Sequence, residues 1–339
     1  MKKVAIVGVT GYTGEELVRI LARHPLVELV AATSENEQGK KLADLYPQFP
    51  RYQNLLITSA EASLQQQVDL AFLCLPAIES SRWGKRYLDN NSRVIDLGAD
   101  FRFPNAAEYQ KWYKTAHPCP ELLEQTVYGL TEWHRQEIRH SRLLGNPGCY
   151  PTAALLALLP FAQAGWLASE PIIIDAKSGV SGAGKTPTRT THYVEANENV
   201  LAYKPGRSHR HVGEIEHELA ALAPADRTVL FTPHLVPQTR GLYASLYFKL
   251  NSARSSAELN DLLRQRYAQE PFVRVVHPEL PSTRMALHSN FCFLAAEAVH
   301  GLSHAMVFSA IDNLGKGASW QAVQNMNLML GFEETTGLL

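Results

Sequence analysis

The first 150 residues alternate short, continuously apolar runs with segments of helical periodicity. The apolar runs are VAIVGV at 4–9, VELVAATS at 27–34, DLAFLCL at 69–75 and RVIDLGA at 93–99. Strands that are apolar on both faces are typical of a parallel sheet covered by helices on both sides. The pattern therefore predicts a doubly wound, Rossmann-type α/β domain over residues 1–148.

The pattern changes after about residue 150. Longer strands are predicted at PIIIDAKS (171–178), TVLFTPHLVP (228–237), LYASLYFKL (242–250) and FCFLAAEAVH (291–300), with a helix at 256–269. We expect an α+β catalytic and substrate domain over 149–312 with a mainly antiparallel sheet. The last segment, 313–339, predicts an amphipathic helix that returns to the first domain, with one apolar face made of Ala318, Ala322, Val323, Met326 and Leu330.

Composition and charge exclude several classes of partner. The 339 residues are 45% hydrophobic and 19% charged, which suits about two folded domains. The 32 basic and 33 acidic residues are spread along the chain, so we expect neither nucleic acid nor membrane as a partner. No segment approaches the ~20 apolar residues of a membrane span. Four widely spaced cysteines predict a reducing, cytoplasmic location without a structural metal.

The first apolar run leads into a glycine-rich turn, GVTGYTG, and then into a helix with Leu17, Val18 and Leu21 on one face. Glycines let backbone N–H groups approach a pyrophosphate, and the helix N-terminus adds partial positive charge. The motif is a GxxGxxG variant, so its place after the first strand carries the prediction, and a purely structural turn is the alternative. The candidate cofactor-binding residues here are Gly8, Thr10, Gly11, Tyr12, Thr13 and Gly14.

The end of the second strand bears on which dinucleotide binds. Thr33 and Ser34 end this strand without an acidic residue, although Glu35 follows. A carboxylate at this point binds a ribose 2′-hydroxyl and repels a 2′-phosphate. Ser34 can donate to that phosphate, and Lys40 or Lys41 can lie near it. The sequence therefore favours NADP(H) over NAD.

Cys149 is the candidate nucleophile. It follows Asn146–Gly148 and precedes a clear helix with proline in its first turn, so its sulfur is predicted at a helix N-terminus. There the macrodipole favours the thiolate, the form that a thioester mechanism needs. Cysteine is more often a small buried hydrophobe, and this is the prediction for Cys74 and Cys292. Cys119, in HPCP, is predicted to be an incidental loop residue.

Eight segments, in order, resemble those of the N-acetyl-gamma-glutamyl-phosphate reductases. They are GYTGEELVRIL, DLGADFR, YGLTEW, NPGCYPTAALLAL, SGVSGAGK, HRHVGEIEHEL, TPHLVPQTRG and DNLGKGASWQAVQNMNLM. The resemblance covers nearly the whole chain, and PGCYPT is its most specific block. The chain departs from the family pattern at Gly98, Ala77 and Trp320, where serine, histidine and a small residue are common.

The resemblance implies a reaction and assigns roles. NADPH would reduce N-acetyl-L-glutamyl 5-phosphate to the 5-semialdehyde with release of phosphate, in arginine biosynthesis. Cys149 would form a thioester, and His211 would exchange a proton with the substrate oxygen, oriented by Glu214. His209 would hold the substrate or the geometry. The other implied residues are Ser178, Gly179, Lys185, Arg207 and Arg240 for the substrate, and Gly182, Asn313, Gly315 and Lys316 for the cofactor.

Other interpretations compete with this one. His209, His211, Glu214 and His217 also have the spacing of a metal site, although this reduction needs no metal. Residues 179–186 match the phosphate-loop pattern GxxxxGK[ST], but no helical period follows them. A carrier-linked aminoadipyl-phosphate reductase of lysine biosynthesis and a non-catalytic NADP sensor are further alternatives. We expect a homo-oligomer, a dimer or a tetramer.

Overall fold

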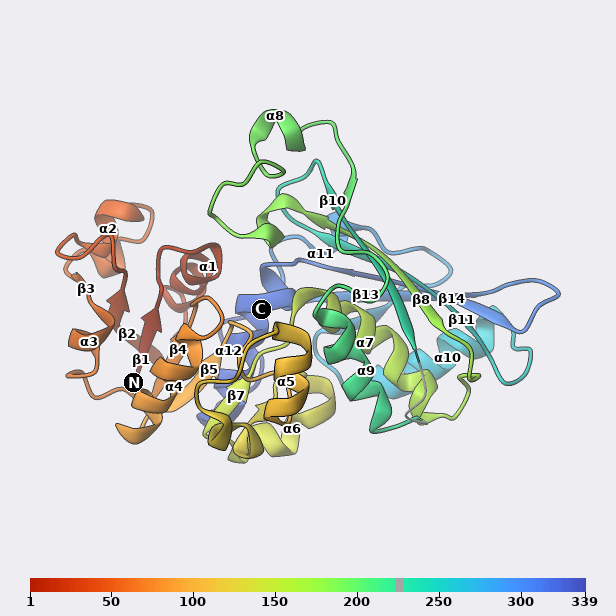
Figure 1. Ribbon diagram of the computed structural model, residues 1–339, viewed down its shortest axis with the longest axis horizontal. Helices are drawn as coiled ribbons and strands as arrows, with labels where there is room; N and C mark the ends of the chain where they lie inside the picture. Colours follow the sequence, from red (N-terminus) through yellow and green to blue (C-terminus); the bar gives the residue numbers. More distant parts are fainter. Residues whose placement is uncertain (224–227) are drawn as a thin grey trace. The chain divides into compact units, whose positions relative to one another are not determined.

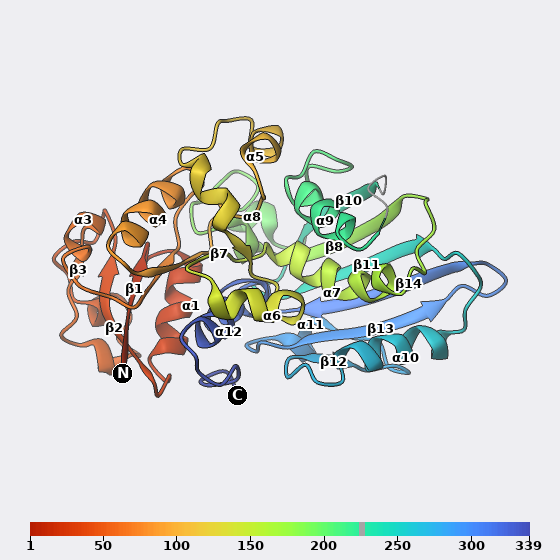
Figure 2. The ribbon, with the colours of Figure 1, turned by 90° about the horizontal axis from the view of Figure 1, so that it is seen from below.

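The computed structural model describes residues 1–223 and 228–339, which divide by their contacts into two compact units (Figures 1 and 2). The first unit comprises Met1–Pro147 together with Ala318–Leu339, and the second comprises Gly148–Gly317. These divisions lie within a few residues of the predicted domain boundaries. Among the described residues, no helix is both long enough and apolar enough to cross a membrane.

The first unit contains a seven-stranded parallel sheet in the order β3-β2-β1-β4-β5-β7-β6. Its strands are β1 (Lys2–Val7), β2 (Val27–Thr33), β3 (Ile57–Thr58), β4 (Leu70–Leu73), β5 (Arg93–Asp96), β6 (Val127–Tyr128) and β7 (Leu143–Gly145). The strand order reverses between β1 and β4, which creates the crevice where doubly wound sheets bind ligands. The four predicted strands are present. The short β3, β6 and β7 were not predicted.

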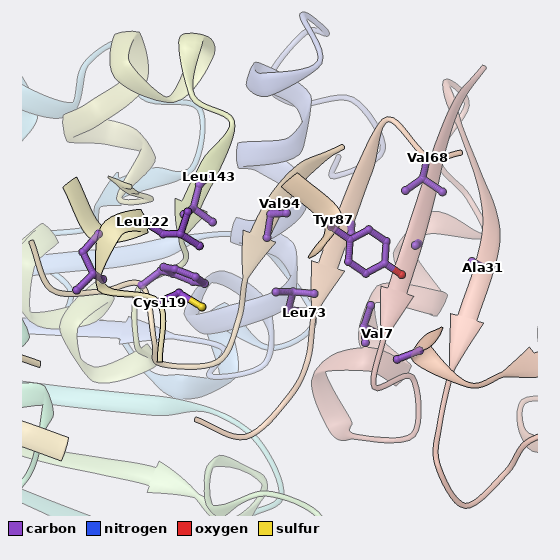
Figure 3. Close-up of a cluster of buried hydrophobic side chains, with 14 residues drawn as sticks. Val7, Ala31, Val68, Leu73, Tyr87, Val94, Cys119, Leu122 and Leu143 are labelled. Atoms are coloured by element: carbon purple, nitrogen blue, oxygen red, sulfur yellow. The ribbon is translucent and has the colours of Figure 1, made fainter. Parts of the chain in front are cut away.

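Helices cover both faces of this parallel sheet. They are α1 (Tyr12–Leu21), α2 (Leu42–Leu45), α3 (Ala60–Ser63), α4 (Glu79–Asp89), α5 (Ala106–Tyr113), α6 (Thr131–His140) and α12 (Trp320–Met329), with short 3-10 turns at Pro50–Tyr52 and Pro120–Gln125. On one face, Tyr87 of α4 and Leu122 pack against Val7 and Leu73 (Figure 3). Cys119 lies in a loop, as predicted, but it is not incidental, because it belongs to this core and is 7% exposed. A sequence window cannot show that a proline-flanked residue folds inward.

The C-terminal helix α12 is buried on all sides, in contrast to the amphipathic helix that was predicted. Its polar residues are buried because they have hydrogen-bond partners within the first unit. Asn325 Nδ2 donates to the Gly129 carbonyl at 2.8 Å, and Asn327 Oδ1 lies 3.0 Å from His24 Nε2. Trp320 Nε1 donates to Glu16 Oε1 of α1 at 2.8 Å, which gives this unusual tryptophan a specific contact.

The second unit contains a mixed, mainly antiparallel sheet in the order β12-β13-β14-β11-β8-β10-β9. Its strands are β8 (Ile172–Gly179), β9 (Leu201–Ala202), β10 (Val229–Val236), β11 (Leu242–Lys249), β12 (Val273–Val275), β13 (Cys292–Ala298) and β14 (His304–Ile311). Its helices are α7 (Cys149–Gln163), α8 (Tyr193–Ala196), α9 (His211–Ala220), α10 (Ser256–Tyr267) and α11 (Thr283–Ala286), and a π-helical turn at Gly315–Ser319 leads toward α12. The four predicted strands and the helix at 256–269 are present, and β9, β12 and β14 were not predicted.

The two faces of this sheet differ in exposure. Helices α7, α9 and α10 lie on one face, where Ile172, Ile174 and Ala176 of β8 are buried (Figure 2). On the opposite face, Ile173 is 47% exposed and is the direct register partner of Leu230 in β10 and Tyr247 in β11. An apolar row across three strands is therefore left open on this face.

Candidate active site

The glycine-rich turn lies at the carboxyl end of β1. Gly8 has a φ of +91°, and a Cβ atom there would lie 2.5 Å from the Cys74 carbonyl oxygen, so only glycine fits. The N–H groups of Gly8 and Val9 donate to the Thr33 carbonyl at 3.2 and 2.9 Å. These contacts join the ends of β1, β2 and β4 at the point where the strand order reverses.

Helix α1 begins directly after this turn, with Gly11 as its N-cap. A Cβ atom at Gly11 would meet only the Gly8 carbonyl oxygen, at 3.8 Å, so there is open space beside the first turn of the helix. There is no such space beside Gly14, because a Cβ atom there would lie 2.5 Å from the same oxygen. An uncapped helix N-terminus beside open space fits the pyrophosphate of a dinucleotide.

Ser34 follows β2 near this turn. Its Oγ lies 3.4 Å from Thr10 Oγ1, which brings together two of the predicted cofactor residues. Lys40 forms an ion pair with Glu37 at 2.5 Å, so its charge is already matched. Lys41 is exposed.

A buried acidic pair lies at the carboxyl end of β5, where Asp96 is the last residue of the strand and Asp100 follows it. Asp100 accepts hydrogen bonds from the N–H groups of Ile78 and Ser81 and from the Tyr109 hydroxyl, all at 2.8–2.9 Å. Ile78 has a φ of +78°, which is strained for a β-branched residue. Asp100 therefore holds a strained turn at the start of α4. Sequence reasoning noted DLGADFR only as a resemblance and missed this role.

Asp96 explains the glycine that replaces the family's usual serine. Burial, followed by the neighbouring charge of Asp100, raises the pKa of Asp96 to about 6. Its carboxylate accepts the Gly98 N–H at 2.7 Å. A Cβ at Gly98 would lie 2.6 Å from Ser80 Oγ and 2.7 Å from Asp96 Oδ1, so a larger residue does not fit without a shift.

In the second unit, Cys149 is the first residue of the 15-residue helix α7, as predicted. Gly148 is the N-cap and provides no side chain to the helix end. Its N–H donates to Oε1 of the buried Glu214 at 2.8 Å, which ties the turn before the cysteine to α9. A Cβ at Gly317 would lie 2.8 Å from Cys149 Cβ, so the chain at 317 approaches the cysteine closely.

Two histidines lie beside this cysteine turn. The rings of His209 and His211 have centroids 4.6 Å apart, and the Tyr150 ring is 6.1 Å from the first and 5.9 Å from the second. His209 Nδ1 accepts the backbone N–H of His211 at 3.2 Å. Burial lowers the pKa of His209 to about 3, so its ring is neutral at physiological pH. His211 begins α9.

The loop after β8 brings several predicted residues together. Ser178 is 1% exposed, and its Oγ would lie 2.8 Å from a Cβ at Gly182. Asn313 Nδ2 donates to Ser181 Oγ at 3.0 Å, while its Oδ1 accepts the Gly241 N–H at 2.8 Å. Gly179 is packed against the 239–240 backbone, since its Cβ would lie 2.7 Å from the Thr239 carbonyl oxygen. The loop is therefore held by its neighbours.

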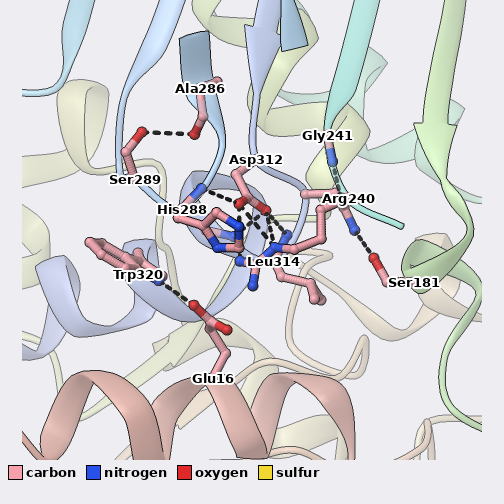
Figure 4. A network of polar contacts seen from close by, with 12 residues as sticks. Glu16, Ser181, Arg240, Gly241, Ala286, His288, Ser289, Asp312, Leu314 and Trp320 are labelled. Carbon is pink, nitrogen blue, oxygen red and sulfur yellow. Dashed lines mark hydrogen bonds and ion pairs between the residues drawn. The ribbon is translucent and has the colours of Figure 1, made fainter. Parts of the chain in front are cut away.

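Asp312 is the centre of a polar network that the sequence did not reveal (Figure 4). It is fully buried and accepts the N–H groups of His288 at 2.7 Å and Leu314 at 2.9 Å. It also pairs with Arg240, whose Nε and Nη2 both lie 3.0 Å from Oδ2. Arg240 is thereby fixed in orientation. The only indication in the sequence was the position of Asp312 directly before Asn313.

Four further predicted ligands have different surroundings. Arg207 forms a bidentate ion pair with Glu216, which itself accepts the Val229 N–H. Lys185 is exposed, and no helix starts at it, which removes the phosphate-loop interpretation. Lys316 is fully buried, with its Nζ 6.0 Å from the centre of the Phe272 ring. Gly315 is packed against the Ser289 carbonyl oxygen, 2.4 Å from its ideal Cβ position.

No group of three or more metal-ligating side chains occurs within residues 1–223 and 228–339. His217, the last member of the metal-like pattern, is an exposed residue of α9.

Comparison with known proteins decides the family. Residues 3–141 match the model described as semialdehyde dehydrogenase, NAD binding domain, and residues 149–313 match semialdehyde dehydrogenase, dimerisation domain. The N-acetyl-gamma-glutamyl-phosphate reductase of Symbiobacterium thermophilum is 48% identical over 338 residues, covering 99% of this chain and 97% of that protein. The protein of the same name from Moorella thermoacetica is 47% identical over 340 residues, with 100% and 98% coverage. The chain belongs to the N-acetyl-gamma-glutamyl-phosphate reductase family.

Solved structures agree with the fold. Aspartate semialdehyde dehydrogenase II from Vibrio cholerae has a TM-score of 0.75 at 19% identity and covers 98% of both chains. The aspartate semialdehyde dehydrogenase of Candida albicans, solved with NADP, has a TM-score of 0.71 at 13% identity, with 97% and 98% coverage. The predicted family and fold class are confirmed. This reductase family is an oxidoreductase family with an NAD-binding domain, and its relatives do not favour the aminoadipyl alternative.

Proposed function

We propose that this reductase converts N-acetyl-L-glutamyl 5-phosphate into N-acetyl-L-glutamate 5-semialdehyde, using NADPH and a thioester on Cys149. The observation that carries the proposal is the position of Cys149 as the first residue of α7, on a turn tied to Glu214. The family membership supports the substrate, because the relatives bear the name of this activity.

The first step uses the cysteine as a nucleophile. Its thiolate attacks the carbonyl carbon, a C–S bond forms, and the C–O bond to phosphate breaks with the electron pair leaving on phosphate. The partial positive charge at the start of α7 stabilises the thiolate. No acidic residue lies in the first turn of α7 to oppose it.

The second step reduces the thioester. Bound NADPH supplies a hydride to its carbonyl carbon. His211 protonates the oxygen that becomes negative and takes that proton back as the C–S bond breaks, which releases aldehyde and thiolate. We assign this exchange to His211 over His209, because the lowered pKa of His209 leaves it neutral and its Nδ1 already accepts the His211 N–H. His209 is a positioning residue.

Anion binding is assigned to Arg240 and the loop after β8. Arg240 is held by the buried Asp312, so its guanidinium has a fixed orientation at small entropic cost. Ser178 and the 179–182 backbone are candidates for holding the thioester oxygen or the phosphate. Arg207 is a weaker candidate because Glu216 neutralises it.

NADP(H) is assigned to the first unit, at the start of α1. The open space beside Gly11 suits the pyrophosphate, and Ser34 and Thr10 suit the 2′-phosphate. Gly182 and Asn313 are proposed to lie near the nicotinamide. Gly315 and Lys316 have a structural contribution within the second unit, where both are buried.

A homo-oligomer is proposed, with the open face of the mixed sheet as its interface. Ile173, Leu230 and Tyr247 form an exposed apolar row on adjacent strands. Contiguous exposed apolar surface marks an interaction site more often than isolated residues do. The family model for residues 149–313 carries the description dimerisation domain.

The test is phosphate-dependent reduction of NADP with N-acetylglutamate 5-semialdehyde, the stable reverse reaction. We expect turnover in the wild type, a preference for NADP over NAD, and no turnover without phosphate. Wild-type enzyme that binds NADP but shows no turnover would overturn the substrate assignment. Activity confined to a carrier-linked aminoadipyl semialdehyde would move the assignment to the lysine pathway.

A further inference from the structure

A basic cavity lies at the amino ends of the parallel sheet, at the other end from the glycine-rich turn. It measures about 560 Å³, and all its lining residues belong to the first unit. Its polar lining includes Lys2, Lys3, Asp69, Asn91, Arg93 and Arg142. The glycine-rich turn is at the opposite end of β1, and the six residues of that strand span roughly 20 Å. The cavity is therefore separate from the nucleotide turn.

The charge of this cavity is unbalanced. The whole chain has 32 basic and 33 acidic residues, whereas the cavity is lined by four cations and a single carboxylate. That carboxylate, Asp69, is already engaged: Oδ1 lies 2.7 Å from Lys2 Nζ, and Oδ2 accepts the Lys3 backbone N–H at 2.7 Å. Within the described part of the chain, Arg93 and Arg142 have no carboxylate partner.

Both arginines are fixed by neutral acceptors. Arg93 Nη1 donates to the Ser141 carbonyl at 2.8 Å. Arg142 Nη2 donates to the Leu88 carbonyl at 3.1 Å and to Asn91 Oδ1 at 3.3 Å. These bonds use one nitrogen of each guanidinium and hold the others in place. Two oriented guanidinium groups and a lysine suit phosphate or carboxylate groups of a ligand.

We propose that this cavity binds a small polyanion, a molecule with two or more phosphate or carboxylate groups. The volume is within the usual range for a small-molecule site. Such a ligand relieves the mutual repulsion of Lys3, Arg93 and Arg142. Met329 and Leu330, at the end of α12, also line the cavity, so the ligand ties the C-terminal helix to the amino edge of the sheet.

The experiment is calorimetric titration of the full chain, saturated with NADP, at constant ionic strength. Pyrophosphate and citrate are the two probes, because they distinguish phosphate from carboxylate recognition. Saturation with NADP keeps pyrophosphate from binding at the glycine-rich turn, so any remaining binding is at another site. We expect one saturable site per chain, and weakening by about tenfold or more in Lys3→Gln and in Arg93→Gln, as for loss of one charge-assisted hydrogen bond.

The matched control is Arg23→Gln, which removes an exposed cation of the same unit outside the cavity and is expected to leave the affinity unchanged. Lys3 is exposed, so Lys3→Gln tests the site even where Arg93→Gln lowers stability. Equal affinity in wild type and in both cavity variants overturns the proposal. So does the absence of saturable binding of both probes to the NADP-saturated chain. None of these outcomes depends on the proposed reaction.

Discussion

Helices α1 and α7 begin with the same backbone conformation, but a different negatively charged group is proposed to lie against each N-terminus. Gly11 has φ and ψ of −72° and 163°, and Gly148 has −65° and 154°, so the two caps share one extended backbone and neither caps its helix with a side chain. Beside α1 there is open space, which suits the phosphates of a bound dinucleotide. At α7 the first residue is Cys149, and its thiolate is the anion that we propose for this helix N-terminus.

This comparison shows one backbone device used for two purposes. A helix N-terminus stabilises whatever negative charge lies against it, and the side chains around it decide which charge that is. Around α1, Gly11 keeps the approach open. Around α7, Glu214, His209 and Tyr150 surround the turn and fix it.

The largest expected effect comes from giving α1 a cap of its own. In Gly11→Asp, the carboxylate accepts the first N–H groups of the helix and repels the phosphates of NADPH. A like charge at about 4 Å costs ~4 kcal/mol at an effective dielectric constant of 20, so we expect NADPH to bind about 1000-fold more weakly. The measurement is the Kd by fluorescence, with the unfolding temperature unchanged or higher. Gly11→Ala is the control, and equal losses in both variants would contradict the account.

At α7 the corresponding variant removes the hydrogen-bond acceptor that holds the turn before Cys149. In Glu214→Ala the Gly148 N–H loses its acceptor, and we expect kcat to fall by about 10- to 100-fold, since hydrogen bonds to charged groups contribute ~1.5–3 kcal/mol. The binding of NADPH should stay unchanged. Glu214→Gln keeps an acceptor oxygen and should recover much of the rate. If NADPH affinity fell together with kcat, the effect would be general misfolding.

His209, beside the α7 turn, makes the stability of the protein depend on pH. Its pKa is lowered from 6.5 to about 3 in the folded protein. As the pH falls below 6.5, His209 is therefore protonated in the unfolded chain but stays neutral in the folded one, which favours unfolding. Between pH 7 and pH 5 this group should lower the free energy of unfolding by about 2 kcal/mol. Denaturant titrations at both pH values should show a smaller loss in His209→Asn. The exposed His217 of α9 is the control. If His217→Asn changed the loss of unfolding free energy between pH 7 and pH 5 as His209→Asn does, the result would count against this assignment.

The smallest expected effect concerns the choice of dinucleotide. Ser34→Ala removes a hydroxyl proposed to donate to the 2′-phosphate, and we expect the preference for NADP over NAD to fall about tenfold. The ratio of kcat/KM for the two cofactors measures it. NAD is the internal control, because its own kcat/KM should be nearly unchanged. An equal fall for both cofactors would mean that Ser34 only supports the end of β2.

Local pattern predicted the two helix starts well because both depend on residues next to each other in sequence. GVTGYTG contains three glycines, and NPGCYP contains two prolines and one glycine. These residues dictate the turns, and α1 and α7 begin where expected. Four strands of each sheet are apolar enough to be recognised, whereas the eight-residue β14 was missed. Strands of two or three residues, such as β6 and β7, contain too few positions for a period to appear.

Partners distant in sequence account for most of what was missed. Arg207 was a plausible anion ligand until the fold placed Glu216 beside it. Asp312 and Asp100 are ordinary acidic residues in the sequence, and only tertiary structure surrounds each with N–H groups. The polar residues of α12 predict an exposed face, yet Asn325 and Asn327 have buried partners in other segments.

The central claim is that Cys149, at the start of α7, forms a thioester during the reaction. Mixing the enzyme with NADP and N-acetylglutamate 5-semialdehyde in the absence of phosphate tests it most directly. The account predicts a burst of one NADPH per active chain, together with an acyl adduct on Cys149 in the mass spectrum, and neither in Cys149→Ser. A burst that persists in Cys149→Ser, or an adduct on another residue, would contradict it.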